Sequence, residues 1–365
     1  MSVTARAVLA ASLFCLPACS DHPTDVGPPL DLPDFRNAAG AARVGVMTQN
    51  LYVGTDVDAV LAALMSPDEA DDLPALMTAI QTFQTTDFPT RATAFADAIA
   101  RERPHVVGLQ EVSDVRIDLS GVGVPIQLNQ QFLPILEAAL AARHLPYVVA
   151  ATVLDFTASP IPGVELKDYE AILVDTSRAT VDFTYTQLFS NNLGVVAPGV
   201  ELKRGLVEVA ATIDGRRYYF VSTHLEPDIA EADLSALRAA QAWELAVAVL
   251  GDSTPAFVMG DLNDTPGSPM YQVLQQAGFI DVWAELRPGA NGYTSPRSPD
   301  LANPRDELTK RIDYIWARGV EHAAAGLRGR IDRLGVRPAE RIPGPYYTMW
   351  PSDHAGLAAS LIAGG

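Results

Sequence analysis

The sequence predicts an α/β fold in which mixed β-sheets are covered by helices. One observation is alternation: an amphipathic helical stretch at 89–104 leads directly into the apolar run HVVGLQEV at 105–112, as α/β domains do. A second is a hairpin at 205–226, where Asp214 and Gly215 join two alternating runs and favour a type I′ turn. Because a purely parallel sheet contains no hairpins, antiparallel pairs must be mixed in.

Hydrophobic periodicity gives the remaining elements in chain order. Pro104 and Gly278 are the expected stops of the helices that precede them. Helices are predicted over residues 56–65, 72–83, 89–104, 129–147, 231–250 and 269–279, and residues 53–90 form a helical elaboration of the domain. Strands are predicted over residues 43–50, 105–112, 147–156, 168–177, 205–226, 255–264, 309–318 and 353–362.

The N-terminus has the features of an export signal. Arg6 precedes a short apolar stretch that is too short to span a bilayer. The stretch ends in LPAC, which resembles a bacterial lipobox with Cys19 as the lipidated residue, although Pro17 is unusual at its position. We therefore expect a signal peptide over 1–18, a lipidated Cys19 and a flexible tether over 19–42, and a catalytic domain over 43–365. Ordinary signal cleavage nearby and retention as an anchor are the alternatives.

Composition limits the classes of function. Hydrophobic residues make up 48% of the chain and charged residues 19%, enough for a sizeable core in a single large domain. The formal net charge is −18, which disfavours tight non-specific binding of nucleic acid. A nuclease is not excluded, because a bound metal can offset the field locally.

Polar side chains stand at the ends of several apolar strands, where a core strand does not need them. They are Asn50, Glu111, His224, Asp261, Asn263, Asp313, Asp353 and His354. Buried acids are costly unless they are paired or bound to metal, so their recurrence predicts one shared site at the strand ends.

Each of these residues also has a structural interpretation. Arg101 or Arg103 would neutralise Glu111, and Lys310 or Arg311 would neutralise Asp313. Asp261 would cap its turn, and His224 would be a satisfied histidine at a strand edge.

Together the motifs TQN at 48–50, LQEV at 109–112, STHL at 222–225, GDLN at 260–263, RIDYI at 311–315 and SDH at 352–354 resemble the endonuclease/exonuclease/phosphatase superfamily. The resemblance covers residues 43 to about 362. It implies the deoxyribonuclease I-like fold, a four-layer sandwich of two packed mixed sheets with helices outside. It also implies hydrolysis of phosphate esters with Mg²⁺ or Mn²⁺.

The resemblance also implies roles for individual residues. Glu111 would bind the metal together with Asn50 and Asp353. Asp261 and Asn263 would orient the attacking water, while His354, supported by Asp313, would act as base or charge stabiliser. His224 would contact the phosphate, and whether Asp261 or His354 takes the proton of the water stays open.

Supporting positions and the substrate are less constrained by the sequence. Glu170 resembles a position that supports the first histidine or contacts substrate, or is an exposed edge-strand acid. Tyr347 and Trp350 would stack a base or touch a membrane, or pack as a loop on the domain edge.

The hypotheses for the function are an exported phosphodiesterase or nuclease acting as a monomer, a phosphomonoesterase or phospholipase C-like enzyme acting on a small or lipid substrate, and a non-catalytic surface lipoprotein. Nucleic acid, nucleotide and phospholipid remain open as substrates. The expected location is the cell envelope (outer membrane or periplasm) or the medium.

Overall fold

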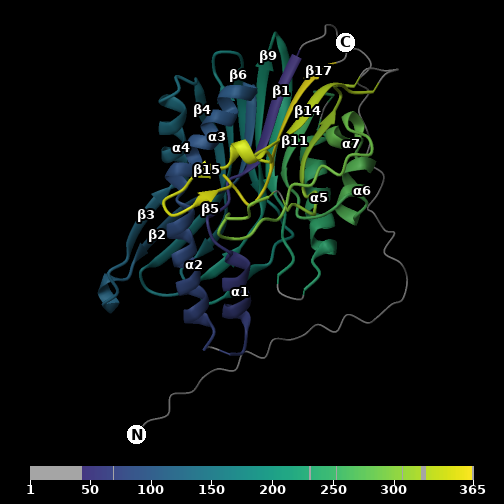
Figure 1. The fold of residues 1–365 in the computed structure, drawn as a ribbon. Helices are drawn as coiled ribbons and strands as arrows, with labels where there is room; N and C mark the ends of the chain where they lie inside the picture. The colour runs from purple at the N-terminus through teal and green to yellow at the C-terminus, as the bar shows by residue number, and fades with distance from the viewer. Residues whose placement is uncertain are drawn as a thin grey trace, which may run out of the picture.

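Two mixed β-sheets pack face to face between helices in the computed structural model (Figure 1). The structure describes residues 43–363 except 69, 230–231, 252, 306 and 322–325. The expected signal peptide, Cys19 and the tether lie outside these described residues.

The first sheet has the strand order β14-β17-β1-β2-β5-β4-β8-β7, with β3 paired to β2. Its central strands β1 and β2 are parallel, while β17 pairs with β1 in the antiparallel sense. The strands are β1 Arg43–Asn50, β2 Val106–Asp118, β3 Gln127–Gln131, β4 Tyr147–Ala158, β5 Val164–Asp175, β7 Gly194–Ala197, β8 Val200–Leu202, β14 Arg328–Leu334 and β17 Gly356–Ile362.

The second sheet has the order β12-β13-β11-β10-β9-β6. Its strands are β6 Thr180–Leu188, β9 Gly205–Ile213, β10 Arg216–His224, β11 Ala256–Asp261, β12 Ile280–Asp281 and β13 Asp313–Arg318. β9 and β10 form the predicted hairpin, and Asp214 (φ 51°) and Gly215 (φ 79°) both adopt the positive φ that a type I′ turn requires. A short pair, β15 Ile342–Pro343 and β16 Thr348–Met349, stands apart from both sheets.

Helices cover the outer faces and complete four layers (Figure 1). An apolar cluster that includes Val46, Ile172, Phe220 and Phe257 fills the space between the sheets. The helices are α1 Val57–Met65, α2 Asp72–Thr86, α3 Phe88–Glu102, α4 Phe132–Ala141, α5 Ser235–Val249, α6 Pro269–Gln276 and α7 Val282–Leu286. α2 to α4 pack on the first sheet and α5 and α6 on the second. The predicted four-layer α/β sandwich is confirmed.

The predicted helix over 129–147 is wrong at both ends. Residues 127–131 form β3, because they pair with the extended end of β2 from Asp114↔Gln131 to Asp118↔Gln127. The helix itself ends at Ala141, and His144 adopts a positive φ of 55°. Strands β6, β7, β8 and β14 were not predicted. β14 carries three arginines and a glycine and takes its extended form from pairing with β17.

α1 and α2 form a helical hairpin that extends beyond the ends of the sheets (Figure 1). Asp56 begins α1 by accepting a hydrogen bond from the backbone nitrogen of Ala59 at 2.9 Å. No helix among the described residues combines the length and the apolar character needed to cross a bilayer.

Candidate active site

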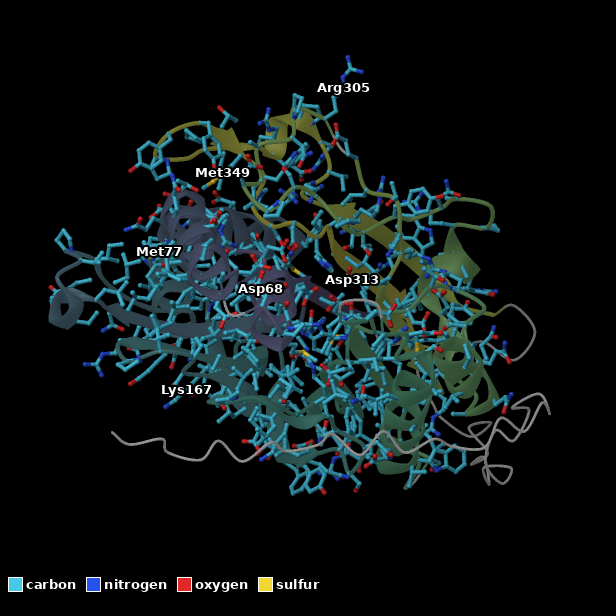
Figure 2. The ribbon with its side chains drawn as sticks, turned by 90° about the horizontal axis from the view of Figure 1, so that it is seen from below. Asp68, Met77, Lys167, Arg305, Asp313 and Met349 are labelled. Atoms are coloured by element: carbon cyan, nitrogen blue, oxygen red, sulfur yellow. The ribbon has the colours of Figure 1, made fainter. Side chains whose placement is uncertain are left out.

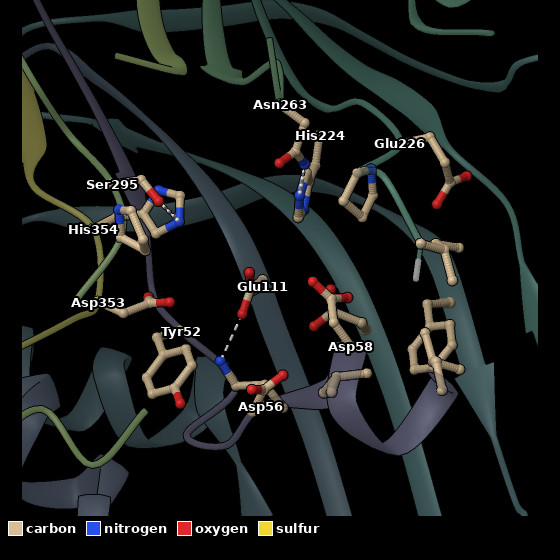
Figure 3. A pocket seen from close by; sticks show the side chains of 18 of the residues that line it. Tyr52, Asp56, Asp58, Glu111, His224, Glu226, Asn263, Ser295, Asp353 and His354 are labelled. Carbon is tan, nitrogen blue, oxygen red and sulfur yellow. Dashed lines mark hydrogen bonds between the residues drawn. The ribbon is translucent and has the colours of Figure 1, made fainter. Parts of the chain in front are cut away.

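The ends of strands from both sheets meet at one edge of the sandwich, above a cleft of about 390 Å³ (Figure 3). Strand register explains why the polar residues gather there. In the second sheet Asp261 of β11 stands opposite both His224 of β10 and Asp313 of β13. In the first sheet, Asn50 ends β1 beside Gln110 of β2, one residue before Glu111.

His354 lies in a pocket of aspartates. Its Nδ1 is 2.8 Å from Oδ2 of Asp313 and 3.5 Å from Oδ2 of Asp261. Its Nε2 is 3.2 Å from the hydroxyl of Ser295, which lines the cleft. Asp313 itself sits in the interior of the molecule (Figure 2). Burial opposes charging of the imidazole, but the carboxylates of Asp313, Asp353 and Asp261 outweigh it and raise the pKa of His354 well above its usual range.

Glu111 is aimed into the cleft by a backbone irregularity. The register between β2 and β5 shifts between Leu109 and Val112, so Glu111 stands at a β-bulge, and its φ is 52°. Bulges often redirect a side chain beside an active site, and a positive φ at a glutamate is an unfavourable conformation that functional sites tolerate. One carboxylate oxygen accepts from Asn50 Nδ2 at 2.8 Å and the other from the backbone nitrogen of Val53 at 2.7 Å.

The cleft holds more negative charge than its side chains balance. Burial, with Glu111 as the strongest like charge, raises the pKa of Asp353 to about 7, and burial followed by Asp313 does the same for Asp261. Such an excess of oxygen donors fits a hard divalent cation such as Mg²⁺ or Mn²⁺. Because each carboxylate oxygen has two lone pairs, Glu111 can supply a ligand atom while it keeps its hydrogen bonds, and Asp353 can supply another. Asn50 turns its amide nitrogen toward Glu111 and its oxygen toward the backbone nitrogen of Tyr52, so in this conformation it holds Glu111 in place.

His224 lies on the opposite side of the cleft. Its Nε2 is 2.9 Å from Asn263 Nδ2, which also donates to the carbonyl of Leu225. Nε2 is therefore the acceptor, and the neutral ring carries its proton on Nδ1, which faces Oε1 of Glu170 at 3.8 Å. Burial lowers the pKa of His224 well below its usual range, and Arg204 adds to the effect.

A buried charged cluster that the sequence analysis missed lies behind His224. Glu170 is fully buried beside Asp155 and Asp168, and burial raises the pKa of all three acids. Arg204 is the principal cation among them, and it pairs with Glu226 at 3.3 Å. Asp155 and Asp168 stand in apolar strands, which is the same signal that identified Glu111. The interpretation of Glu170 as an exposed acid on an edge strand is wrong, because β5 lies between β2 and β4 and Glu170 is fully buried.

The structure contradicts several of the non-catalytic interpretations given above for the strand-end residues. Arg101 pairs with Glu102 and Glu340, and Arg103 pairs with Asp175, so neither neutralises Glu111. Arg311 pairs with Asp281 at 2.7 Å and leaves Asp313 to His354. β10 is an interior strand, so His224 is not at a sheet edge. Asp261 does bond its own turn, through the backbone nitrogen of Asn263 at 3.0 Å.

The substrate role suggested for Trp350 and Tyr347 is not supported by their positions. Trp350 is fully buried, donates its ring N–H to the carbonyl of Asn303, and lies against the guanidinium of Arg297. The Tyr347 hydroxyl donates to Thr85 at 3.3 Å, and neither ring lines the cleft. Both residues pack a loop on the domain edge, which was the structural alternative.

The model of the Endonuclease/Exonuclease/phosphatase family matches residues 47–354, which include every residue of the cleft described above. The chain belongs to this family. Solved structures share the fold. A family protein from Bacteroides thetaiotaomicron superposes with a TM-score of 0.55 at 16% identity, covering 89% of this chain and 99% of that one. Zebrafish (D. rerio) TDP2 in complex with a single-strand DNA product gives 0.51 at 15% identity, covering 88% and 99%.

Curated relatives match only part of this family member. The Emericella nidulans CCR4-Not complex 3′-5′-exoribonuclease subunit Ccr4 is 27% identical over 131 residues, which is 32% of this chain and 19% of the relative. A putative neutral sphingomyelinase from Drosophila melanogaster is 30% identical over 152 residues, 39% of this chain and 32% of the relative. The chain thus spans less than a third of the length of either relative.

Proposed function

We propose that the protein is an exported, divalent-metal-dependent phosphodiesterase. The observation that carries the proposal is the arrangement around one cleft of the His354–Asp313 pair, the bulge residue Glu111 and the His224–Asn263 pair. Family membership and the phosphodiester substrates named for its relatives, RNA for Ccr4 and sphingomyelin for the fly protein, agree with it.

Glu111 and Asp353 would hold a Mg²⁺ or Mn²⁺ ion, which supplies neutralisation of the phosphate charge when it is bound. Asn50 keeps Glu111 oriented from one side, and the backbone nitrogen of Val53 keeps it oriented from the other. Without such anchors a flexible glutamate would lose side-chain entropy on binding the ion, so the hydrogen bonds preorganise the ligand.

The reaction needs one proton acceptor and donors for the phosphate. The water oxygen forms a bond to phosphorus, one ester P–O bond breaks, and the released alcohol leaves with a proton. Asp261 accepts the proton of the water, and the charged ring of His354, whose Nδ1 lies 3.5 Å from Oδ2 of Asp261, stabilises the negative charge that develops. Asp313 fixes the orientation of the imidazole. Asn263 and His224 line the other side of the cleft, and a proton on Nε2 of His224 would let the ring donate to the phosphate in place of its hydrogen bond with Asn263.

The direct test measures hydrolysis of bis(p-nitrophenyl) phosphate by purified residues 20–365 with Mg²⁺, Mn²⁺ or EDTA. We expect turnover with a metal and none with EDTA, and we expect Glu111→Gln to lower kcat by about 10²-fold or more. The exposed His144→Ala variant is the control and should match the wild type. Undiminished turnover in EDTA would refute the metal dependence. Absence of turnover on this ester, plasmid DNA, RNA and lipid would favour a binding protein.

Export by lipidation is a separate part of the proposal, and it rests on the LPAC motif. In a bacterial host, the wild-type chain should fractionate with membranes and incorporate labelled fatty acid. Cys19→Ser should abolish the label and move the protein to the soluble fraction. Labelling that persists in Cys19→Ser would show that Cys19 is not the modified residue.

A further inference from the structure

An apolar pocket of about 80 Å³ lies next to the catalytic cleft, between the helical hairpin and the first sheet. Only Thr55 and Glu165 are polar among the side chains that line it. The apolar lining comes from α1 and α2 on one side, from β2, β4, β5 and β8 on the other, and from the loops that contain Val53 and Pro160. The lining residues are Val53, Val57, Val60, Leu61, Leu64, Leu76, Ala79, Ile80, Phe83, Val115, Ile117, Phe156, Ala158, Pro160, Val164, Leu166 and Val200.

This pocket and the cleft share a wall. Six residues line both: Val53, Thr55, Val57, Leu61, Phe156 and Leu166. Val53 also connects them chemically, because its backbone nitrogen holds Glu111 at 2.7 Å while its side chain lines the pocket. A phosphodiester held at Glu111 therefore lies close to the mouth of an apolar pocket.

The cleft itself disfavours a polyanion. Apart from the carboxylates proposed to bind the metal, its lining includes Asp56 and Asp58 on the side of the apolar pocket (both labelled in Figure 3). Two further acids of the lining, Glu226 and Asp228, pair with Arg204 and Arg238. Asp56 and Asp58 line the cleft, and Val57, which stands between them in the sequence, lines both the cleft and the apolar pocket. Successive phosphates of a nucleic acid would meet these carboxylates, whereas a single phosphodiester next to a cationic group would be attracted.

We propose that the substrate is a phosphodiester lipid, with the first carbons of one acyl or alkyl chain in this apolar pocket and a cationic head group among the cleft acids. The proposal rests on the phosphodiesterase function proposed above. Burial of each methylene contributes about 0.8 kcal/mol, so a few carbons suffice to select a lipid over a short ester. The pocket is small, so it receives part of one chain, and the remainder follows the apolar side chains of α1 and α2.

The first test uses the wild-type full chain with methyl, hexyl and dodecyl p-nitrophenyl phosphate, each below its micelle concentration. All three esters release the same p-nitrophenol. We expect kcat/KM to rise at least about tenfold from the methyl to the dodecyl ester. Equal kcat/KM values for the three esters would overturn the lipid proposal and leave the phosphodiesterase function intact. The same conclusion would hold if the enzyme also hydrolysed plasmid DNA while the three values stayed equal. No turnover of any ester would overturn both.

The second test alters the pocket away from the shared wall. Ala158→Trp fills the pocket from the end of β4, and Leu64→Asn makes its α1 side polar. Each should lower the dodecyl-to-methyl ratio of kcat/KM about tenfold. Val247→Trp, at a half-exposed position of α5, is the matched control and should keep the wild-type ratio. Thermal unfolding confirms that each variant is folded, and an unchanged ratio in folded Ala158→Trp would overturn the proposal.

Discussion

The two histidines of the cleft have the same side chain and nearly the same burial, but opposite surroundings. His354 faces Asp313, Asp261 and Asp353, which favour its charged form. His224 lies near Arg204 and accepts a hydrogen bond from Asn263, so its neutral form is favoured. Burial acts against the charge on both rings, so the carboxylates around His354 are what make its protonation state differ from that of His224. The fold thus gives His354 a protonated, charged ring and His224 a neutral ring that accepts a hydrogen bond.

Removing the first ring should have the largest effect. His354→Ala deletes the charged ring that stabilises the developing negative charge beside Asp261, and we expect kcat on bis(p-nitrophenyl) phosphate to fall by about 10²- to 10⁴-fold. Steady-state kinetics at saturating Mg²⁺ would measure this. A loss below tenfold would show that Asp261 works without the ring and that His354 does not stabilise the transition state.

The support of His354 should matter next. Asp313→Asn keeps the size of the side chain but removes the negative charge that lies 2.8 Å from Nδ1. Because the charged ring and its orientation both depend on this carboxylate, kcat should fall by about 10²-fold with little change in KM. Asp313→Glu is the matched variant that restores the charge. If Asp313→Asn alters KM alone, Asp313 contributes to substrate binding and not to the catalytic step.

On the opposite side, Glu170→Gln should have a smaller effect. The carboxyl of Glu170 is 3.8 Å from His224 Nδ1, which is too far for a direct hydrogen bond. Its contribution to the orientation of the ring should therefore be small, because Asn263 already holds the ring. We expect kcat to fall by about tenfold. A loss as large as that of Asp313→Asn would remove the proposed difference between the two histidines.

The sequence predicted the strand-end residues because polar groups after apolar strands are conspicuous, and register then brings Asp261, His224 and Asp313 together. It did not predict the bulge at Glu111, since nothing in LQEV specifies a positive φ at glutamate. Asp155 and Asp168 were missed because their partners Arg204 and Glu226 come from distant parts of the chain. The sequence left two interpretations of Trp350 open because local sequence does not reveal that Arg297 and Asn303 enclose its ring.

The two sides of the cleft can also be compared through the pH dependence of stability, because buried acids lie behind His224. Burial, despite nearby Arg204, raises the pKa of Asp155 well above its usual value, and Asp168 raises it further. The unfolded chain releases this proton near pH 4 while the fold retains it, so stability falls as the pH rises above about 4.

Asp155→Asn removes this penalty and should stabilise the protein by about 1 kcal/mol at pH 8. At pH 4, where the unfolded chain still keeps much of the proton, the gain should be close to zero. Urea unfolding at the two pH values measures the difference, with Glu137→Gln at an exposed position of α4 as the control. Destabilisation at pH 8 would mean that Asp155 is ionised and paired with Arg204, and that the cluster on the His224 side is as strongly charged as the one around His354.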